Sequence, residues 1–262
     1  MTKFFDKIRI NLWKNDLLMA LGFLTRIPVP YHENHDRLLM SAGWCFPIIG
    51  SMIGYAGGLL LWLLLVLNVP TLVASFLTIG ALAFLTGGLH EDGLADTFDG
   101  FGAGTNKKTI VTIMRDPQIG TFGTLALIIF CGIKAISIAT LADNSKIFLS
   151  IAALVSAHAL SRFLFLPVCY FFDSASHTGV AKFAGRPEQG TLYVAFFVTS
   201  VILITLLPFS EAIFVTCFVA TTTYFFALMV RRRIGGYTGD TLGAGQQISE
   251  TITLVYLASI SN

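Results

Sequence analysis

Four of the chain's 15 acidic residues fall within nine positions, in the segment HEDGLADTFDG (90–100). Asp92, Asp96 and Asp99 are spaced i, i+4 and i+7, which places three carboxylates on one face of a helix, and Glu91 can reach the same region from the side. Carboxylates that share a helix face repel one another unless a cation neutralises them. Oxygen ligands without cysteine suit Mg²⁺ or Mn²⁺, which a few carboxylates hold together with substrate phosphates. These four residues are therefore predicted to form a metal site.

His90 adjoins the carboxylates, and an imidazole in this place can act as a base or as a hydrogen-bond donor to phosphate. The alternative for the whole segment is a solvated acidic turn. Such a turn needs no helical register and no flanking glycines, yet glycines follow at positions 100, 102 and 104. The segment therefore favours a ligand site over a turn.

Two later segments carry residue types that suit phosphate. In MRDPQIGTFG (114–123), Arg115 offers a planar donor fork, although a basic anchor at the membrane surface would look the same. Asp116 is either a further ligand or a helix N-cap. In GYTGDTLGAGQQISE (236–250), Asp240 precedes a predicted helix, which it either caps or joins to a metal or phosphate site.

Charged residues also lie inside predicted apolar helices, at Glu250, Lys134 and Arg162. A charge within the bilayer is costly, so each is a functional candidate by default. The alternative for the two cations is that they snorkel to an interface. Pairing of Glu250 with one of them stays open. The predicted substrate- and phosphate-binding residues are Arg115, Asp116, Asp240 and Glu250.

The elements that must position these residues are predicted to be membrane-spanning helices. Of the 262 residues, 55% are apolar and only 12% are charged, where soluble domains carry roughly 25% charged residues. The mean hydropathy is +0.75, so lipid must solvate much of the chain. Long apolar runs without alternation favour helices over a barrel. The runs that could span a bilayer lie at about 40–68, 71–88, 122–142, 147–171, 191–208, 211–230 and 242–260.

A shorter apolar run at 17–27 predicts an interfacial or re-entrant helix. We therefore expect an all-α, polytopic integral membrane bundle of about seven transmembrane helices, forming a single membrane-embedded catalytic domain over residues 1–262. Within it, residues 1–37 form a basic, amphipathic N-terminal segment, and residues 89–121 form an acidic active-site loop.

Basic residues indicate which side of the membrane the loops occupy. With seven spans, every Lys and Arg outside the spans except Lys146 falls on one side, which the positive-inside rule assigns to the cytoplasm. The active-site loop 89–121 lies on that side. The net charge of +2 is too small to indicate a nucleic-acid partner.

The segments GGLHEDGLADTFDGFGAG, MRDPQIGTFG and GYTGDTLGAGQQISE together resemble the cobalamin synthase family, the adenosylcobinamide-GDP ribazoletransferases, in order and spacing. The resemblance covers the chain from about Leu17 onward. It implies an enzyme of the bacterial inner membrane that joins adenosylcobinamide-GDP to α-ribazole, or to α-ribazole 5′-phosphate, releases GMP and requires Mg²⁺. The family's carboxylates fall on Glu91, Asp92, Asp96, Asp99 and Asp240.

In phosphoryl transfer the protein mainly positions groups and neutralises charge. We therefore expect Asp92, Asp96 and Asp99 to bind one or two Mg²⁺ ions that bridge the diphosphate, and Arg115 to hold a phosphate oxygen. Glu91 or His90 takes the proton of the attacking 5′-hydroxyl. The predicted catalytic residues are Glu91, His90, Asp92 and Asp96.

Two other functions remain as alternatives. The first is a CDP-alcohol-type or prenyl-type transferase, but the DGxxAR pattern of the CDP-alcohol enzymes is missing, because Asp96 follows Asp92-Gly-Leu-Ala where that pattern has its arginine. The second is a secondary transporter, which would explain the intramembrane charges but not the acidic cluster. The sequence leaves open whether the chain forms a homo-oligomer.

Overall fold

The computed structural model describes residues 2–30, 38–143, 147–175 and 184–261. All regular elements in these residues are helices, as predicted, and the one β-type contact there is an isolated bridge between Ser174 and Tyr237. The helices are α1 (Thr2–Leu24), η1 (Leu39–Cys45), α2 (Phe46–Val66), α3 (Thr71–Thr86), α4 (Leu89–Ala103), α5 (Lys107–Ile113), α6 (Thr121–Asp143), α7 (Ile147–Phe163), α8 (Phe165–Phe171), α10 (Gln189–Leu206), α11 (Phe209–Ile234) and α12 (Gly239–Ser259).

Five helical segments are long and apolar enough to cross a membrane, and a sixth is added if α3 and α4 form one broken span. The five are Leu39–Val66, Thr121–Ala142, Ile147–Phe171, Gln189–Leu206 and Phe209–Ile234. The polytopic helical prediction is therefore confirmed, but the count of seven is not. The last predicted span, at 242–260, corresponds to α12, a helix of 21 residues. Its buried side includes Gln246, Gln247 and Glu250, so the helix is too polar to qualify as a membrane span by composition alone.

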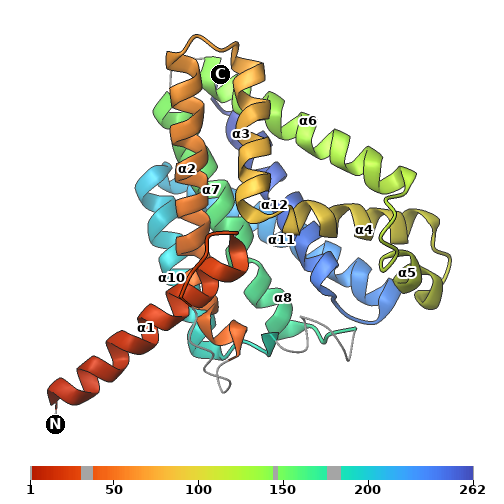
Figure 1. The fold of residues 1–262 in the computed structure, drawn as a ribbon, viewed down its shortest axis with the longest axis horizontal. Coiled ribbons are helices and arrows are strands. Elements are labelled where there is room, and N and C mark those ends of the chain that lie inside the picture. Colours follow the sequence, from red (N-terminus) through yellow and green to blue (C-terminus); the bar gives the residue numbers. More distant parts are fainter. Residues whose placement is uncertain (1, 31–37, 144–146, 176–183, 262) are drawn as a thin grey trace.

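The α3–α4 region accounts for the other missing span. The helix α3 has only 16 residues, fewer than the roughly 20 that a bilayer requires. Gly87 and Gly88 then take left-handed backbone angles, with φ of 71° and 68°, a conformation that glycine adopts without steric cost. The two helices meet at 95°, and in Figure 1 α4 leaves the lower end of α3 sideways toward α5.

Two predicted boundaries differ from the structure. The short helix expected at 17–27 is the end of a longer one, because α1 begins at Thr2 and ends at Leu24. The segment 89–121, predicted as a loop, is mostly helical, since α4 and α5 occupy it. The acidic residues therefore lie on a rigid helix rather than on a flexible connection.

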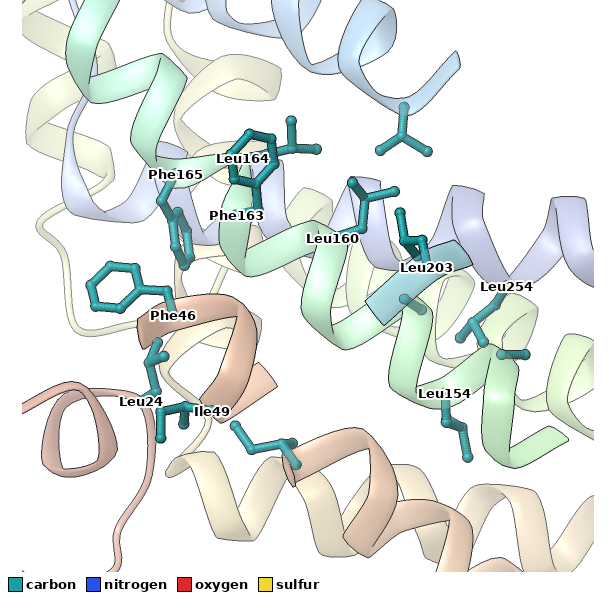
Figure 2. Packing of buried hydrophobic residues seen from close by; sticks show 14 of the residues in the cluster. Leu24, Phe46, Ile49, Leu154, Leu160, Phe163, Leu164, Phe165, Leu203 and Leu254 are labelled. Carbon is teal, nitrogen blue, oxygen red and sulfur yellow. The ribbon is translucent and has the colours of Figure 1, made fainter. Parts of the chain in front are cut away.

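Glycines allow the closest helix contacts in the bundle. A Cβ atom on Gly50 would collide with the carbonyl oxygen of His158, and one on Gly54 would lie 2.5 Å from that of Leu154. This small-xxx-small spacing on α2 lets its backbone approach α7, as in other membrane helix pairs. Figure 2 shows the apolar side chains that fill the surrounding space, including Ile49 of α2 and Leu160 of α7.

A second glycine contact positions the acidic helix. A Cβ on Gly93 of α4 would lie 2.7 Å from the carbonyl oxygen of Asp240, and one on Gly243 of α12 would lie 3.3 Å from the Cα of His90. Because no side chain separates the two backbones here, the acidic face of α4 lies close to the start of α12. This contact brings the segments 90–100 and 236–250 together, although they are far apart in the sequence.

Candidate active site

Two cavities converge on the acidic helix. The larger has a volume of about 1410 Å³ and lies between the end of α1, the α3–α4 junction and the turn at 114–119. The smaller has a volume of about 430 Å³ and lies between η1, α4, α8 and the start of α12. Asp92 and Arg115 line both cavities, so the two spaces meet at an opposed pair of charges.

The predicted site residues divide between these cavities. Of those that line only one of the two, the larger cavity has Glu91, Asp96 and Asp116, and the smaller cavity has His90 and Asp240. Asp99 and Glu250 line neither of them.

Asp99 contacts the start of α6 and lines neither cavity. Its Oδ2 accepts a hydrogen bond from the backbone N–H of Gly120 at 2.7 Å, and its Oδ1 accepts one from Gly123 at 2.8 Å. Both amides are among those that a helix leaves without an internal partner, and a carboxylate at this end also suits the helix dipole. The geometry therefore gives Asp99 the role of an N-terminal cap for α6, and its predicted role as a metal ligand stays a prediction.

Replacing Asp99 with alanine should therefore destabilise the protein. Two backbone amides would lose their acceptor, one of them buried, and the free energy of unfolding should fall by about 1–3 kcal/mol. Thermal unfolding of the purified protein in detergent measures the loss. Asp173→Ala is the matched control, because the side chain of Asp173 is 90% exposed. Equal melting temperatures for the two variants would contradict the capping role.

Asp116 also has a local backbone role. Its Oδ1 accepts a hydrogen bond from the backbone N–H of Gln118 at 3.0 Å, which closes a turn. Because α6 begins only at Thr121, Asp116 is not the N-cap of that helix. It remains an exposed residue on the larger cavity.

The remaining aspartates interact electrostatically. Burial and the negative charges of Asp92, Asp240 and Asp99, in that order, raise the pKa of Asp96 to about 7. Burial and the charge of Asp92 likewise raise the pKa of Asp240, while Arg115 opposes the shift. Both groups lie outside the five apolar spans. The carboxylates of α4 and α12 therefore form one negative site, for which a cation would relieve the repulsion.

The donor types at this site are those that hold a metal jointly with a substrate. Among the described residues, no three His, Cys, Asp or Glu side chains converge tightly enough to form a complete metal cage. Mg²⁺ is nevertheless commonly held by one or two carboxylates together with substrate phosphates, because it keeps several waters and needs few protein ligands. Asp92, Asp96 and Asp240 provide this kind of donor set.

His90 has an unusual environment. It is 1% exposed, its ring stacks on Phe165 with centroids 5.7 Å apart, and neither ring nitrogen has a hydrogen-bond partner in the part of the chain that the structure describes. Burial and, next, the charge of Arg162 hold the pKa of His90 well below its ordinary value, so the imidazole is neutral.

Glu250 lies in a buried ionic cluster. Its carboxylate accepts hydrogen bonds from Arg162 of α7, from Lys134 of α6 at 3.1 Å and from Gln246 at 2.6 Å. His158 Nδ1 lies 3.1 Å from the same carboxylate. The geometry does not place Glu250 with the phosphate-binding residues, because two buried cations pair with it instead. Both intramembrane cations are its partners.

Gln247 connects this cluster to the larger cavity. Lys134 Nζ donates a hydrogen bond to Gln247 Oε1 at 2.7 Å, and Gln247 Nε2 donates one to Glu91 Oε1 at 3.0 Å. Glu91 Oε2 is buried and has no hydrogen-bond partner among the described residues. One oxygen of Glu91 is therefore held by Gln247, and the other is buried without a partner among the described residues.

Sequence reasoning missed two residues at this site. Gln247 was visible as a polar side chain in an apolar helix, but nothing in the pattern linked it to Glu91. Arg26 lines the larger cavity and lies over Gly87, where a Cβ would collide with its Nε. Its only signal in the sequence was its charge.

Comparison with known proteins identifies the family of the chain. A family model described as cobalamin-5-phosphate synthase matches residues 16–258. The adenosylcobinamide-GDP ribazoletransferase of Allorhizobium ampelinum is 38% identical over 95% of this chain and 98% of its own length. The protein of the same name from Brucella anthropi is 37% identical over 92% of this chain and 95% of its own length. No solved structure matches the chain. The chain belongs to the cobalamin-5-phosphate synthase family and is a transferase of cobalamin biosynthesis.

Proposed function

We propose that the junction of the two cavities is the catalytic centre, where Asp92, Asp96 and Asp240 hold Mg²⁺, or Mn²⁺ in its place, against a substrate diphosphate. The reaction joins adenosylcobinamide-GDP to α-ribazole, or to its 5′-phosphate, and releases GMP. The observation that carries the proposal is that Asp92 and Arg115 line both cavities. Two substrates can therefore reach one charged centre from separate spaces.

The chemistry requires one bond to form and one to break. The 5′-hydroxyl oxygen of α-ribazole attacks the phosphorus on the cobinamide side of the diphosphate, and the bond from that phosphorus to the oxygen of GMP breaks. Arg115 and Arg26 hold phosphate oxygens, for which a guanidinium is a bidentate donor. Bound Mg²⁺ supplies charge neutralisation for the leaving phosphate.

Glu91 is the group that takes the hydroxyl proton. Gln247 fixes its Oε1 through a hydrogen bond of 3.0 Å, and its Oε2 has no hydrogen-bond partner among the described residues. A carboxylate with one oriented and one free oxygen is suited to general base catalysis. His90 was the other predicted base and stays the alternative, because it lines the smaller cavity, which also reaches Asp92.

We propose further that the site faces the cytoplasm, across the bacterial inner membrane. The support comes from basic residues near α4. Arg233 donates hydrogen bonds to the carbonyl oxygens of Phe101 and Gly104, and Lys107 lies beside Gly235. Basic residues concentrate on the cytoplasmic side of membrane proteins, so the end of the bundle that holds the site belongs on that side.

The test is GMP release by the purified enzyme in detergent, with adenosylcobinamide-GDP and α-ribazole supplied and the free Mg²⁺ concentration varied. We expect release to require α-ribazole, to stop when EDTA removes the metal and to return with Mg²⁺ or Mn²⁺. Release that persists at the full rate in EDTA would overturn the metal assignment. Turnover of a CDP-alcohol, without release of GMP, would favour the CDP-alcohol type of transferase instead.

A further inference from the structure

We infer that the smaller cavity is the binding pocket of the acceptor nucleoside, with His90 as one of its polar contacts, and that the larger cavity takes the corrinoid nucleotide. This inference rests on the proposed function, because it assigns the two substrates of that reaction to the two spaces that meet at Asp92. The pocket assignment can fail while the metal assignment stands, and the metal assignment can fail while the pocket assignment stands.

The volumes favour this assignment. Pockets for small organic ligands measure roughly 300–1,000 Å³, and the smaller cavity, at about 430 Å³, lies within that range. It has room for a nucleoside, which is a bicyclic base on one ribose. A corrin ring with its side chains and a guanosine diphosphate is several times larger than a nucleoside. Of the two cavities, only the one of about 1410 Å³ approaches that size.

The lining of the smaller cavity suits a flat aromatic base. Phe46 and Phe165 meet edge to face with centroids 6.3 Å apart, and both line the cavity. Figure 2 shows these two side chains as neighbours, one from the start of α2 and one from α8. Phe23, Tyr237 and Met40 add further apolar surface. The benzimidazole base of α-ribazole can stack or pack edge-on against such rings.

His90 adds a polar group that the protein itself leaves without a partner among the described residues. A buried imidazole with no partner for either nitrogen loses the hydrogen bonds that it made in water, which costs free energy. Its two ring nitrogens can exchange hydrogen bonds with a ligand. The α-ribazole molecule carries a matching set, namely a ring nitrogen that accepts and ribose hydroxyls that donate. A bound acceptor would therefore satisfy a group that the protein alone leaves without a partner.

The larger cavity is lined by more charged side chains than the smaller one. Arg26 and Arg115 line it together with Asp92 and Asp96, so it offers two guanidinium groups and a negative site to one ligand. A diphosphate with its metal requires these groups, whereas a neutral nucleoside does not. The charge of the lining and the volume therefore assign the donor to the same cavity.

Steady-state kinetics with each substrate varied in turn tests the inference. His90→Phe keeps an aromatic ring beside Phe165 and removes both nitrogens. We expect the KM for α-ribazole to rise about tenfold, the effect of one lost hydrogen bond, and the KM for adenosylcobinamide-GDP to stay unchanged. Leu18→Ala is the reciprocal control, because Leu18 lines only the larger cavity. It should raise the KM for the donor alone.

A second variant covers the case in which His90→Phe fails to fold. Gly239 lines the smaller cavity, and a Cβ there would meet no atom within 4 Å, so Gly239→Leu should fold and partly fill the pocket. We expect a rise in the KM for α-ribazole of at least about tenfold, which corresponds to roughly 1.4 kcal/mol of lost binding free energy. A rise confined to the donor KM in either variant, or no change in the acceptor KM with Gly239→Leu, would overturn the pocket assignment.

These outcomes are separate from those of the metal test. If GMP release needs no divalent metal, the metal assignment fails while the KM values still report which cavity holds which substrate. If release needs the metal but Gly239→Leu leaves the acceptor KM unchanged, only the pocket assignment fails.

Discussion

Asp92→Asn enzyme is expected to release GMP at less than about one-hundredth of the wild-type rate, because a single preorganised electrostatic contact to the transition state is worth roughly 10²–10³ in kcat. Of the acidic residues that the structure describes, only Asp92 lines both cavities. Asparagine has nearly the same shape but lacks the negative charge that would hold Mg²⁺ at the diphosphate. The assay follows GMP at saturating concentrations of both substrates and of Mg²⁺.

The control for this variant is Asp173→Asn, the same chemical change at a carboxylate that is 90% exposed and lines neither cavity. It should keep the wild-type rate. Both variants should insert into the membrane and melt at the wild-type temperature, because Asp92 is itself an exposed side chain. A wild-type rate from Asp92→Asn would remove Asp92 from the metal site.

Helical spacing predicted the local structure of the acidic segment correctly. The i, i+4, i+7 pattern of Asp92, Asp96 and Asp99 indicated a helix, and α4 is a helix through all three. Spacing could not show what packs against that face. The start of α6 reaches its last turn, and Gly120 and Gly123 bring their backbone amides onto Asp99. One helix face can therefore carry both carboxylates that line a cavity and a carboxylate that caps another helix, and only the tertiary structure shows which is which.

Hydropathy predicted the class of the fold but not all of its spans. A window of apolar residues at 71–88 looks the same whether the helix continues or turns, and here Gly87 and Gly88 turn it through 95°. Intramembrane charge likewise marked Glu250 as unusual without naming its partners. Lys134 and Arg162 belong to two other helices, α6 and α7, and the sequence does not specify how these helices pack.

Glu250→Gln should destabilise the protein more than Asp99→Ala does. Glu250 is 4% exposed and pairs with Lys134 and Arg162, which are 2% and 1% exposed. Removing its charge leaves two buried cations without a counter-ion, and breaking a buried pair in this way costs about 3–5 kcal/mol. Unfolding of the purified protein by heat or by a denaturing detergent measures the loss. Glu188→Gln, at an exposed position before α10, is the matched control.

A double variant shows whether the loss comes from uncompensated charge. Lys134→Met keeps a long apolar side chain and removes one cation, so the pair Glu250→Gln with Lys134→Met should be more stable than the sum of the two single changes predicts. Residues in one network commonly couple by about 0.5–3 kcal/mol. Strict additivity would mean that the cluster acts through packing alone. Wild-type stability of Glu250→Gln would mean that water or another group compensates the cations. If the two changes are strictly additive, the hydrogen bonds from Lys134 to Gln247 and from Gln247 to Glu91 would orient Glu91, the proposed base, through packing rather than through charge.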